Sequence, residues 1–214
     1  MCIRDSIDTA GIRKKSKVHE NLEFYSVMRA IKAIEEADVC LLLVDATQGV
    51  EAQDMSIFRI AQRRNKGIVL LVNKWDLVEK ETNTAKEMEE QLRQRIAPFS
   101  DVPIVFMSAL NKQRILKAIE AGIQVFENRN QRIQTSRLND LLEEALAKYP
   151  PPSHKGRFPK IKYVTQLPTY YPAFAFFCSN PKYVKEAYKQ YLENFLRKRF
   201  NFTGVPIGIF LRKK

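Results

Sequence analysis

A short apolar run ends directly at a polar tetrapeptide, and this junction restricts the fold and the chemistry of the chain more than any other feature. Ile68–Val72 has the length of one buried strand, and Asn73, Lys74, Trp75 and Asp76 follow it without a gap. The carboxylate of Asp76 can accept two hydrogen bonds from the N1–H and N2–H2 groups of guanine, which adenine does not offer. The amide of Asn73 can donate and accept at the Hoogsteen edge of a purine. The aliphatic stem of Lys74 can lie across the base while its ammonium stays in water. The tetrapeptide therefore predicts a guanine reader.

Two further polar clusters support this interpretation. Asp8–Gly11 reads D-T-A-G, and Ser108 with Ala109 follows another apolar run, Pro103–Met107. All three clusters stand at or near the carboxyl end of a predicted strand, where open α/β sheets bind their ligands. Their order resembles that of the translation-factor-like GTPases. The shared order and strand context favour a nucleotide site over three accidental polar turns.

Predicted strands and helices alternate around these clusters. Strands are expected at Val39–Val44, Ile68–Val72 and Pro103–Met107, and helices at about 22–36, 51–64 and 112–127. Another helix is expected over Lys86–Ile96, behind a capping box formed by Thr84 and Glu87. This alternation predicts a parallel sheet covered by helices.

The pattern changes after Arg129, where an α-β-β-α-β unit is expected. Its predicted elements are a helix over Ser136–Lys148, strands over Lys160–Gln166 and Ala173–Ser179, a long helix from Asn180 and Pro181 to Arg199, and a strand over Pro206–Leu211. The long helix carries an apolar and aromatic stripe: Val184, Ala187, Tyr188, Tyr191, Phe195 and Leu196. We interpret this stripe as core, because it lies on one side at the helical period, rather than as a base-stacking platform.

The charge divides the chain near the same point. Residues 1–127 hold 19 Lys and Arg against 19 Asp and Glu, whereas residues 128–214 hold 17 against 5, so the whole net charge of +12 lies in the second part. This asymmetry predicts two modules and a polyanionic partner, nucleic acid, for the second. A solvated basic surface without a partner is the alternative.

Other composition features exclude several classes of protein. Cys2, Cys40 and Cys178 are scattered without C-x-x-C spacing, which is typical of a reducing cytosol and argues against disulfides and structural zinc. His19 and His154 are too far apart in the sequence to suggest a metal cluster. The chain has no apolar run of about 18 residues and no secretion-signal pattern. We therefore expect a cytoplasmic protein that does not contact the membrane.

Over residues 7–214 the chain resembles the Der (EngA) family of bacterial double-Era-like GTPases. The segments that carry this resemblance are Asp8–Lys15, Asn73–Asp76, Ser108–Ala109, Tyr191–Asn194 and Val205–Ile207. The resemblance implies an α/β fold: an incomplete P-loop-type GTPase domain at 7–128 and a small α+β KH-like domain at 129–214. It also implies a factor for assembly of the large ribosomal subunit, with GTP or GDP and magnesium as ligands and ribosomal RNA as partner. In the intact family member, potassium and a first GTPase domain are expected as well.

The resemblance also implies individual residue roles. The implied GTP-binding residues are Asp8, Thr9, Ala10, Gly11, Ile12, Asn73, Lys74, Trp75, Asp76, Ser108 and Ala109. Asp8 would lie in the outer shell of magnesium, the Gly11 N–H would meet the γ-phosphate, and the Ala109 N–H would point at the guanine O6. Ile12 stands where Ras-type proteins carry the glutamine that positions water, so no catalytic residue is expected in this chain.

The sequence departs from the family pattern in the segment that would bind the phosphates of the nucleotide. None of its seven glycines belongs to a G-x-x-x-x-G-K-[ST] loop, and only seven residues precede Asp8. Because that loop supplies most of the attraction for the β- and γ-phosphates, we expect a front-truncated GTPase that does not hydrolyse GTP alone. We interpret residues 1–6 as a foreign start, with a divergent natural strand as the alternative. The strand at 39–44 would then become an exposed apolar edge.

The second part lacks the G-x-x-G loop with which standard KH domains clamp a nucleic-acid backbone. Any RNA contact is therefore expected through basic side chains, with these candidates: Lys155, Arg157, Lys160, Lys162, Arg197, Lys198 and Arg199. Three functions remain open: a ribosome-assembly GTPase, an RNA-binding or interaction module without nucleotide turnover, and a fragment without activity of its own.

Overall fold

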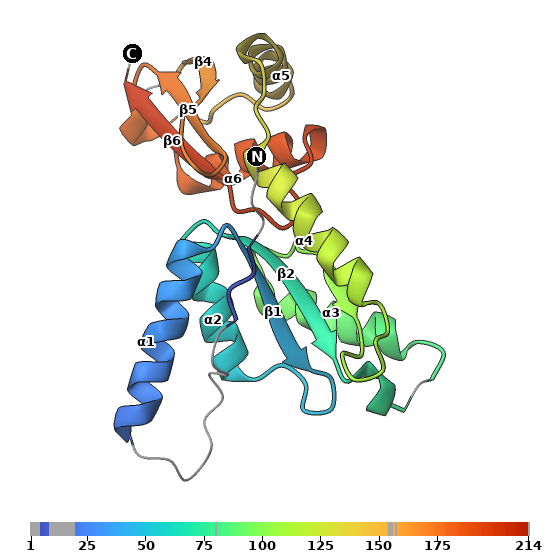
Figure 1. The fold of residues 1–214 in the computed structure, drawn as a ribbon. Coiled ribbons are helices and arrows are strands. Elements are labelled where there is room, and N and C mark those ends of the chain that lie inside the picture. The colour runs from blue at the N-terminus through green and yellow to red at the C-terminus, as the bar shows by residue number, and fades with distance from the viewer. Residues whose placement is uncertain (1–4, 9–19, 80, 154–155, 157, 214) are drawn as a thin grey trace. The chain divides into compact units, whose positions relative to one another are not determined.

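The computed structural model describes residues 5–8, 20–79, 81–153, 156 and 158–213, with the side chains of residues 20–27 left out. The chain divides into two compact units, Met1–Phe126 and Glu127–Lys214, called unit 1 and unit 2 below. Figure 1 shows the helices and strands of both units. Each unit has its own hydrophobic core. None of the described helices combines the length and the hydropathy that a membrane crossing requires.

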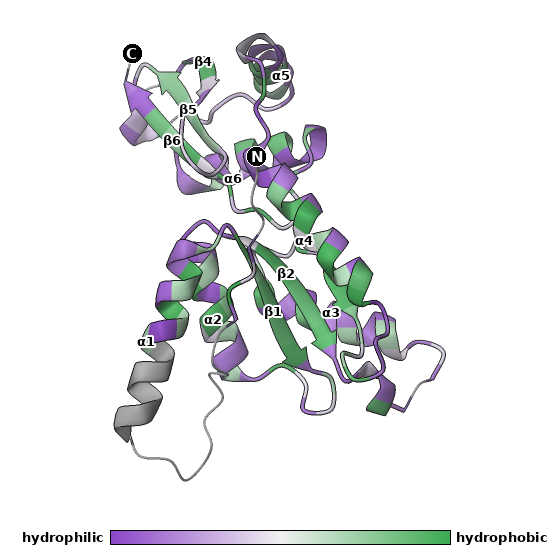
Figure 2. Cartoon of the chain, in the orientation of Figure 1, coloured by the Kyte–Doolittle hydropathy of each residue, from purple (hydrophilic) through white to green (hydrophobic). Residues whose placement is uncertain are grey.

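Unit 1 contains a parallel sheet, as the sequence predicted, and its strand order is β1-β2-β3. Its described elements are α1 (Glu20–Glu36), β1 (Val39–Asp45), α2 (Ala52–Arg63), β2 (Gly67–Asn73), the 3-10 turn η1 (Trp75–Leu77), α3 (Thr84–Ile96), β3 (Ile104–Phe106) and most of α4 (Ile115–Asn130). The last four residues of α4 belong to unit 2. The central strand β2 is buried along its whole length up to Val72, which explains its uninterrupted apolar sequence (Figure 2). Its neighbour β1 lies at one end of the described sheet.

The packing of unit 1 is tight around the start of β2 and open on one face of β1. A side chain added at Gly67 would bring its Cβ within 2.6 Å of Val125 Cγ1, so only glycine lets α4 approach this closely. On β1, Leu41 and Leu43 are 44% and 51% exposed. One face of β1 thus presents exposed apolar side chains, while the exposed backbone edge expected for this strand stays a prediction.

Helix α3 begins earlier than the sequence suggested. It starts at Thr84 rather than Lys86, and Asn83 precedes it without a side-chain cap. The Thr84 Oγ1 accepts a hydrogen bond from the Glu81 N–H at 2.8 Å instead of capping the helix. The predicted capping box with Glu87 is therefore wrong, because Thr84 is itself the first helical residue.

Helix α4 begins later than predicted, at Ile115 instead of 112. Lys112 and Arg114 adopt left-handed backbone conformations, with φ of 53° and 59°, and these cannot continue a right-handed helix. The turn is closed by a bridge in which Ser108 and Gln113 exchange backbone hydrogen bonds of 2.9 and 3.2 Å.

Unit 2 has the predicted α-β-β-α-β order and a second sheet with the strand order β4-β5-β6. Its elements are α5 (Thr135–Lys148), β4 (Ile161–Gln166), β5 (Ala173–Cys178), the 3-10 turn η2 (Pro181–Tyr183), α6 (Glu186–Arg199) and β6 (Gly208–Lys213). β4 pairs antiparallel with β5, and β5 pairs parallel with β6. The continuous helix expected from Asn180 is wrong, because Pro181 opens only a 3-10 turn and Val184 is extended and buried before α6 begins.

The core of unit 2 lies between the two helices and one face of this sheet. It is formed by side chains of α5, α6 and alternate strand positions, among them Leu138, Leu142, Val164, Phe174, Phe176, Tyr188, Leu192 and Leu196. The stripe on α6 is thus core, as predicted, except for Ala187, which is exposed. Two stripe tyrosines also tie α6 to α5: the hydroxyl of Tyr188 donates to the Tyr149 carbonyl and that of Tyr191 to the Ala145 carbonyl.

Candidate functional site

The carboxyl ends of the three strands of unit 1 are joined by backbone hydrogen bonds. Asp45 and Asn73 are register partners at the ends of β1 and β2. The Ala46 N–H donates to the Asn73 carbonyl at 2.9 Å, and the Trp75 N–H donates to the Met107 carbonyl at 3.1 Å. The loops that follow β1, β2 and β3 therefore form one connected edge, where a ligand of a parallel sheet is expected.

Asn73 is oriented by the loop that follows β3. The Ala109 N–H donates to the Asn73 Oδ1 at 2.9 Å. The oxygen of the amide is thus used inside the protein, while its Nδ2 donor has no acceptor among the described residues. This bond gives Ala109 a different partner from the guanine O6 that the resemblance implied, and it shows how the S-A and N-K-W-D motifs are coupled.

Lys74 is fixed by both its backbone and its ammonium. Its φ of 62° and ψ of 29° place it in the left-handed region. Its Nζ lies 2.7 Å from the Asp45 Oδ2, and its side chain is 51% exposed. The prediction that the ammonium stays in water is therefore only half right, because an ion pair holds it at the end of β1.

Asp45 is a site residue that the sequence reasoning missed. Its side chain is 7% exposed, and its Oδ1 accepts hydrogen bonds from the Thr47 N–H at 3.0 Å and the Thr47 Oγ1 at 2.7 Å. Burial alone would raise the pKa of Asp45, but the hydrogen bonds from Lys74 and Thr47 and the charge of Lys74 outweigh it and lower the pKa from 3.8 to about 2. The available signal was that Asp45 ends β1 as Asn73 ends β2.

Trp75 and Asp76 have opposite environments within the η1 turn. Trp75 is 7% exposed, and its ring packs against Phe106 with 4.5 Å between ring centroids. Trp75 thus anchors the turn in the core instead of lining a ligand site, unlike the role that the resemblance implied. The Asp76 carboxylate is half-buried and has no hydrogen-bond donor or cation within the described part of the chain. It therefore remains available to accept hydrogen bonds from a ligand.

Ser108 has a local role in the following loop. It is 1% exposed, and its Oγ accepts the Asn111 N–H at 3.1 Å. Its backbone also pairs with Gln113. We conclude that Ser108 shapes the turn that presents Ala109.

The D-T-A-G cluster is described only at its first residue. Asp8 is exposed and belongs to no helix or strand, while Thr9, Ala10, Gly11 and Ile12 lie outside the described residues. Over the described ranges, no group of three or more His, Cys, Asp or Glu side chains could hold a metal ion. Asp8 alone does not make a magnesium site, and its place in the outer shell of the ion stays a prediction.

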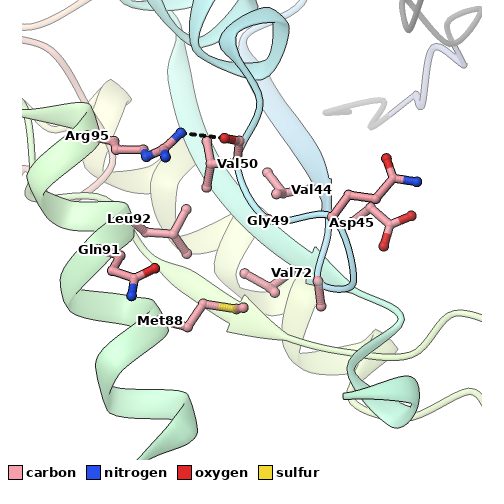
Figure 3. A pocket seen from close by; sticks show the side chains of 11 residues that line it. Val44, Asp45, Gly49, Val50, Val72, Met88, Gln91, Leu92 and Arg95 are labelled. Carbon is pink, nitrogen blue, oxygen red and sulfur yellow. Dashed lines mark hydrogen bonds between the residues drawn. The ribbon is translucent and has the colours of Figure 1, made fainter. Parts of the chain in front are cut away.

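A mainly apolar pocket lies beside this edge, between the β1–α2 loop and α3. It is lined in part by Val44, Val50 and Val72 and by Met88 and Leu92 of α3 (Figure 3). The guanidinium of Arg95 donates to the Val50 carbonyl and holds the loop against α3. The Asp45 carboxylate points away from α3 in Figure 3, and its partners are Lys74 and Thr47.

The basic residues predicted to contact RNA differ in their availability. Arg197 is held inside unit 2, because it pairs with Glu193 and donates to the carbonyls of Phe202 and Val205. Arg199 pairs with Glu144. The remaining described candidates are exposed: Lys160, Lys162 and Lys198. Lys155 and Arg157 lie outside the described residues.

Relatives of this chain are GTPases. GTPase Der of Flavobacterium johnsoniae and GTPase Der of Christiangramia forsetii are each 59% identical to it over 208 residues, 97% of this chain and 48% of their own length. The chain thus spans about half the length of these relatives. The crystal structure of Aquifex aeolicus Era bound to GDP·AlF4− covers 97% of this chain and 75% of that one at 17% identity, with a TM-score of 0.48, too low to add to the argument.

Family models match both parts of the chain. Residues 132–212 match the KH-domain-like C-terminal domain of EngA bacterial GTPase enzymes, and residues 23–150 match the elongation factor Tu GTP binding domain. The predicted fold class, a helix-covered parallel sheet followed by a small KH-like domain, is confirmed. The chain therefore belongs to the family of elongation factor Tu-type GTP-binding domains, and its resemblance to the Der (EngA) GTPases is confirmed.

Proposed function

We propose that unit 1 recognises the guanine base of GTP or GDP. Two side chains carry this proposal: the carboxylate of Asp76, which has no partner among the described residues, and the amide of Asn73, which the Ala109 N–H has already oriented. Asp76 would accept hydrogen bonds from the guanine N1–H and N2–H2, and the Asn73 Nδ2 would donate to the purine N7. The stem of Lys74, held at its far end by Asp45, would cover one face of the base.

We also propose a reaction for the whole protein. The relatives carry the name GTPase, and this chain spans about half of their length. We assign GTP hydrolysis in ribosome assembly to the complete protein, and base recognition to the residues described here. None of the described residues is assigned a catalytic role.

A titration that responds to weak binding tests the base recognition. The full chain, labelled with 15N, is titrated with guanosine monophosphate and separately with adenosine monophosphate, and amide and side-chain resonances are followed. We expect GMP to shift the side-chain NH2 signal of Asn73 and the backbone signals of residues 73–76, and AMP to leave them unchanged. Equal shifts with both nucleotides, or no shift with either, would refute the proposal.

The charge of unit 2 supports a second function, binding to RNA. Residues 128–214 hold 17 Lys and Arg against 5 Asp and Glu, and they match a KH-like domain. Following the resemblance, we propose ribosomal RNA of the large subunit as the partner. The affinity of the full chain for RNA should fall steeply with salt, because each phosphate contact releases counterions. An affinity that does not change with salt would contradict this function.

A further inference from the structure

The sheet of unit 2 has one face that the helices do not cover. The side chains on the helix-facing side of the sheet belong to the core of unit 2 or pack against it: Val164, Phe174, Phe176, Cys178, Ile209 and Leu211. Since side chains alternate along a strand, the positions between them lie on the opposite face. Tyr163 and Phe177 are register partners, as are Phe177 and Arg212, and Ala175 and Phe210. We call Tyr163, Phe177, Phe210 and Arg212 the aromatic face.

The rings of the aromatic face pack against one another or against the sheet. Tyr163 and Phe177 are stacked, with 4.4 Å between centroids and an interplanar angle of 13°. Phe210 is 41% exposed. A Cβ added at Gly208 would lie 2.9 Å from Phe210 Cε2 and 3.1 Å from Tyr171 Cε2, so the missing side chain lets both rings lie over this glycine.

The charges near this face all have one sign. The five acidic residues of 128–214 all belong to the two helices: Asp140, Glu143, Glu144, Glu186 and Glu193. The strands and their connections carry no carboxylate side chain, whereas Lys160, Lys162, Arg212 and Lys213 on or beside the strands are exposed. The Arg212 side chain has neither an ion-pair nor a hydrogen-bond partner among the residues that the structure describes. Figure 2 shows the hydrophilic end of β6 beside its apolar start.

The combination of exposed aromatic rings and unopposed cations favours one kind of partner. A second copy of the chain would bring the same cations, which repel one another, and an apolar peptide would leave them without counter-charge. A polyanion with flat rings satisfies both features, because its phosphates pair with the cations and its bases stack on the aromatic side chains. Double-stranded RNA hides its bases inside the helix, so it would use only the cations.

We propose that the aromatic face binds the unpaired bases of single-stranded RNA, with Arg212 contacting a phosphate. This site rests on the RNA-binding function proposed for unit 2 and gives it a surface. It lies on the sheet face opposite α5 and α6, and it uses no G-x-x-G loop.

Fluorescence anisotropy of the full chain tests the site with two labelled probes: an unstructured single-stranded RNA of roughly 12 nucleotides and a duplex of the same length. We expect Phe210→Leu, which keeps an apolar side chain but removes the ring, to weaken single-strand binding about tenfold and to leave duplex binding unchanged. Phe210→Tyr should bind as the unchanged protein does. Arg212→Gln should weaken the binding of both probes, and the salt dependence of the affinity should fall by about one phosphate contact.

Lys198→Gln on α6 is the matched control for charge, since Lys198 is exposed on the helical side, and it should weaken binding less than Arg212→Gln does. Unchanged single-strand affinity in Phe210→Leu, or equal loss in Lys198→Gln and Arg212→Gln, would overturn the site while leaving RNA binding itself intact. If the unchanged protein binds neither probe, the RNA-binding function fails together with the site. Because Arg212 is exposed, its variant decides the question even if Phe210→Leu does not fold.

Discussion

Units 1 and 2 build their candidate surfaces from different kinds of backbone. In unit 1, the described non-glycine residues with positive φ are Asn65, Lys74, Lys112 and Arg114, and the last three belong to the loops after β2 and β3. In unit 2, the described positive-φ residues are Gly156 and Gly204, for which this conformation costs little. The guanine site therefore depends on turns that are costly to form, whereas the aromatic face lies on strands, with one register shift between Ile161 and Tyr163.

This difference predicts how each surface responds to mutation. Left-handed conformations of residues with a side chain cost of the order of 1–2 kcal/mol and persist only where surrounding contacts hold them. At Lys74 those contacts are the ion pair with Asp45 and the hydrogen bond from the Leu77 N–H to the Lys74 carbonyl. Loss of either contact should therefore disturb the whole guanine site, while single changes on the aromatic face should act locally.

The largest expected effect is a loss of stability when a core side chain of either unit is truncated. Phe58 and Phe174 are each 0% exposed, one in the core of unit 1 and the other in that of unit 2. Phe58→Ala and Phe174→Ala should each lower the free energy of unfolding by about 3–5 kcal/mol, because each leaves a cavity. Hydrogen exchange should show loss of protection mainly in the mutated unit. Equal loss in both units for both variants would mean that the cores are not separate.

A smaller effect is expected from the ion pair of unit 1. Asp45→Asn removes the charge that holds the Lys74 ammonium and weakens the acceptor for Thr47. We expect the free energy of unfolding to fall by about 1–2 kcal/mol near neutral pH, measured by urea denaturation. A matched change, Asp76→Asn, at a half-buried carboxylate that has no partner among the described residues, should have less effect on the free energy of unfolding. A loss as large in Asp76→Asn would argue against a special role for Asp45.

The same carboxylate gives unit 1 a specific acid sensitivity. The pKa of Asp45 is lowered from 3.8 to about 2 in the folded chain, so its ionised form stabilises the fold above about pH 4. This contribution should be lost as the pH falls from about 4 through about 2, because the folded state then takes up the proton. The difference in stability between the unchanged protein and Asp45→Asn should shrink over this range. A difference that is constant between pH 5 and about pH 2 would contradict the assignment.

Effects of similar or smaller size concern the backbone itself. Gly204 has a φ of 78° and is buried, so Gly204→Ala should destabilise unit 2 by about 1–2 kcal/mol. Lys112 has a φ of 53° and is exposed, so Lys112→Gly should stabilise unit 1 by about 0.5–1 kcal/mol. Thermal denaturation measures both. If Lys112→Gly destabilises the protein, the turn after β3 is not strained in the way proposed.

The sequence predicted the sheets better than the loops. The apolar run at 68–72 could be recognised because β2 is buried on both faces, and β1 and β3 followed from the same composition. The late start of α4 could not be predicted, because Lys112 and Arg114 have no local preference for left-handed backbone and are held by the Ser108–Gln113 bridge. The start of α6 was wrong for a similar reason: the burial of Val184 in the core overrides the helix signal of Pro181.

The candidate site was predicted in its residue types but not in its contacts. The guanine motif named Asn73, Lys74 and Asp76, yet the ion pair of Lys74 with Asp45 depends on the register between β1 and β2. Trp75 stands inside the motif, but its ring belongs to the core, which only the position of Phe106 reveals. Tertiary contacts of this kind join residues far apart in the sequence, so local patterns do not contain them.

The most direct test of guanine recognition reverses the chemistry of Asp76. Xanthine carries a carbonyl where guanine carries its N2 amino group, and the amide of Asp76→Asn could donate to it. In the 15N titration, the unchanged protein should respond to guanosine monophosphate and not to xanthosine monophosphate, and Asp76→Asn should show the reverse preference. A variant that keeps the response to guanosine monophosphate would show that Asp76 does not read the base.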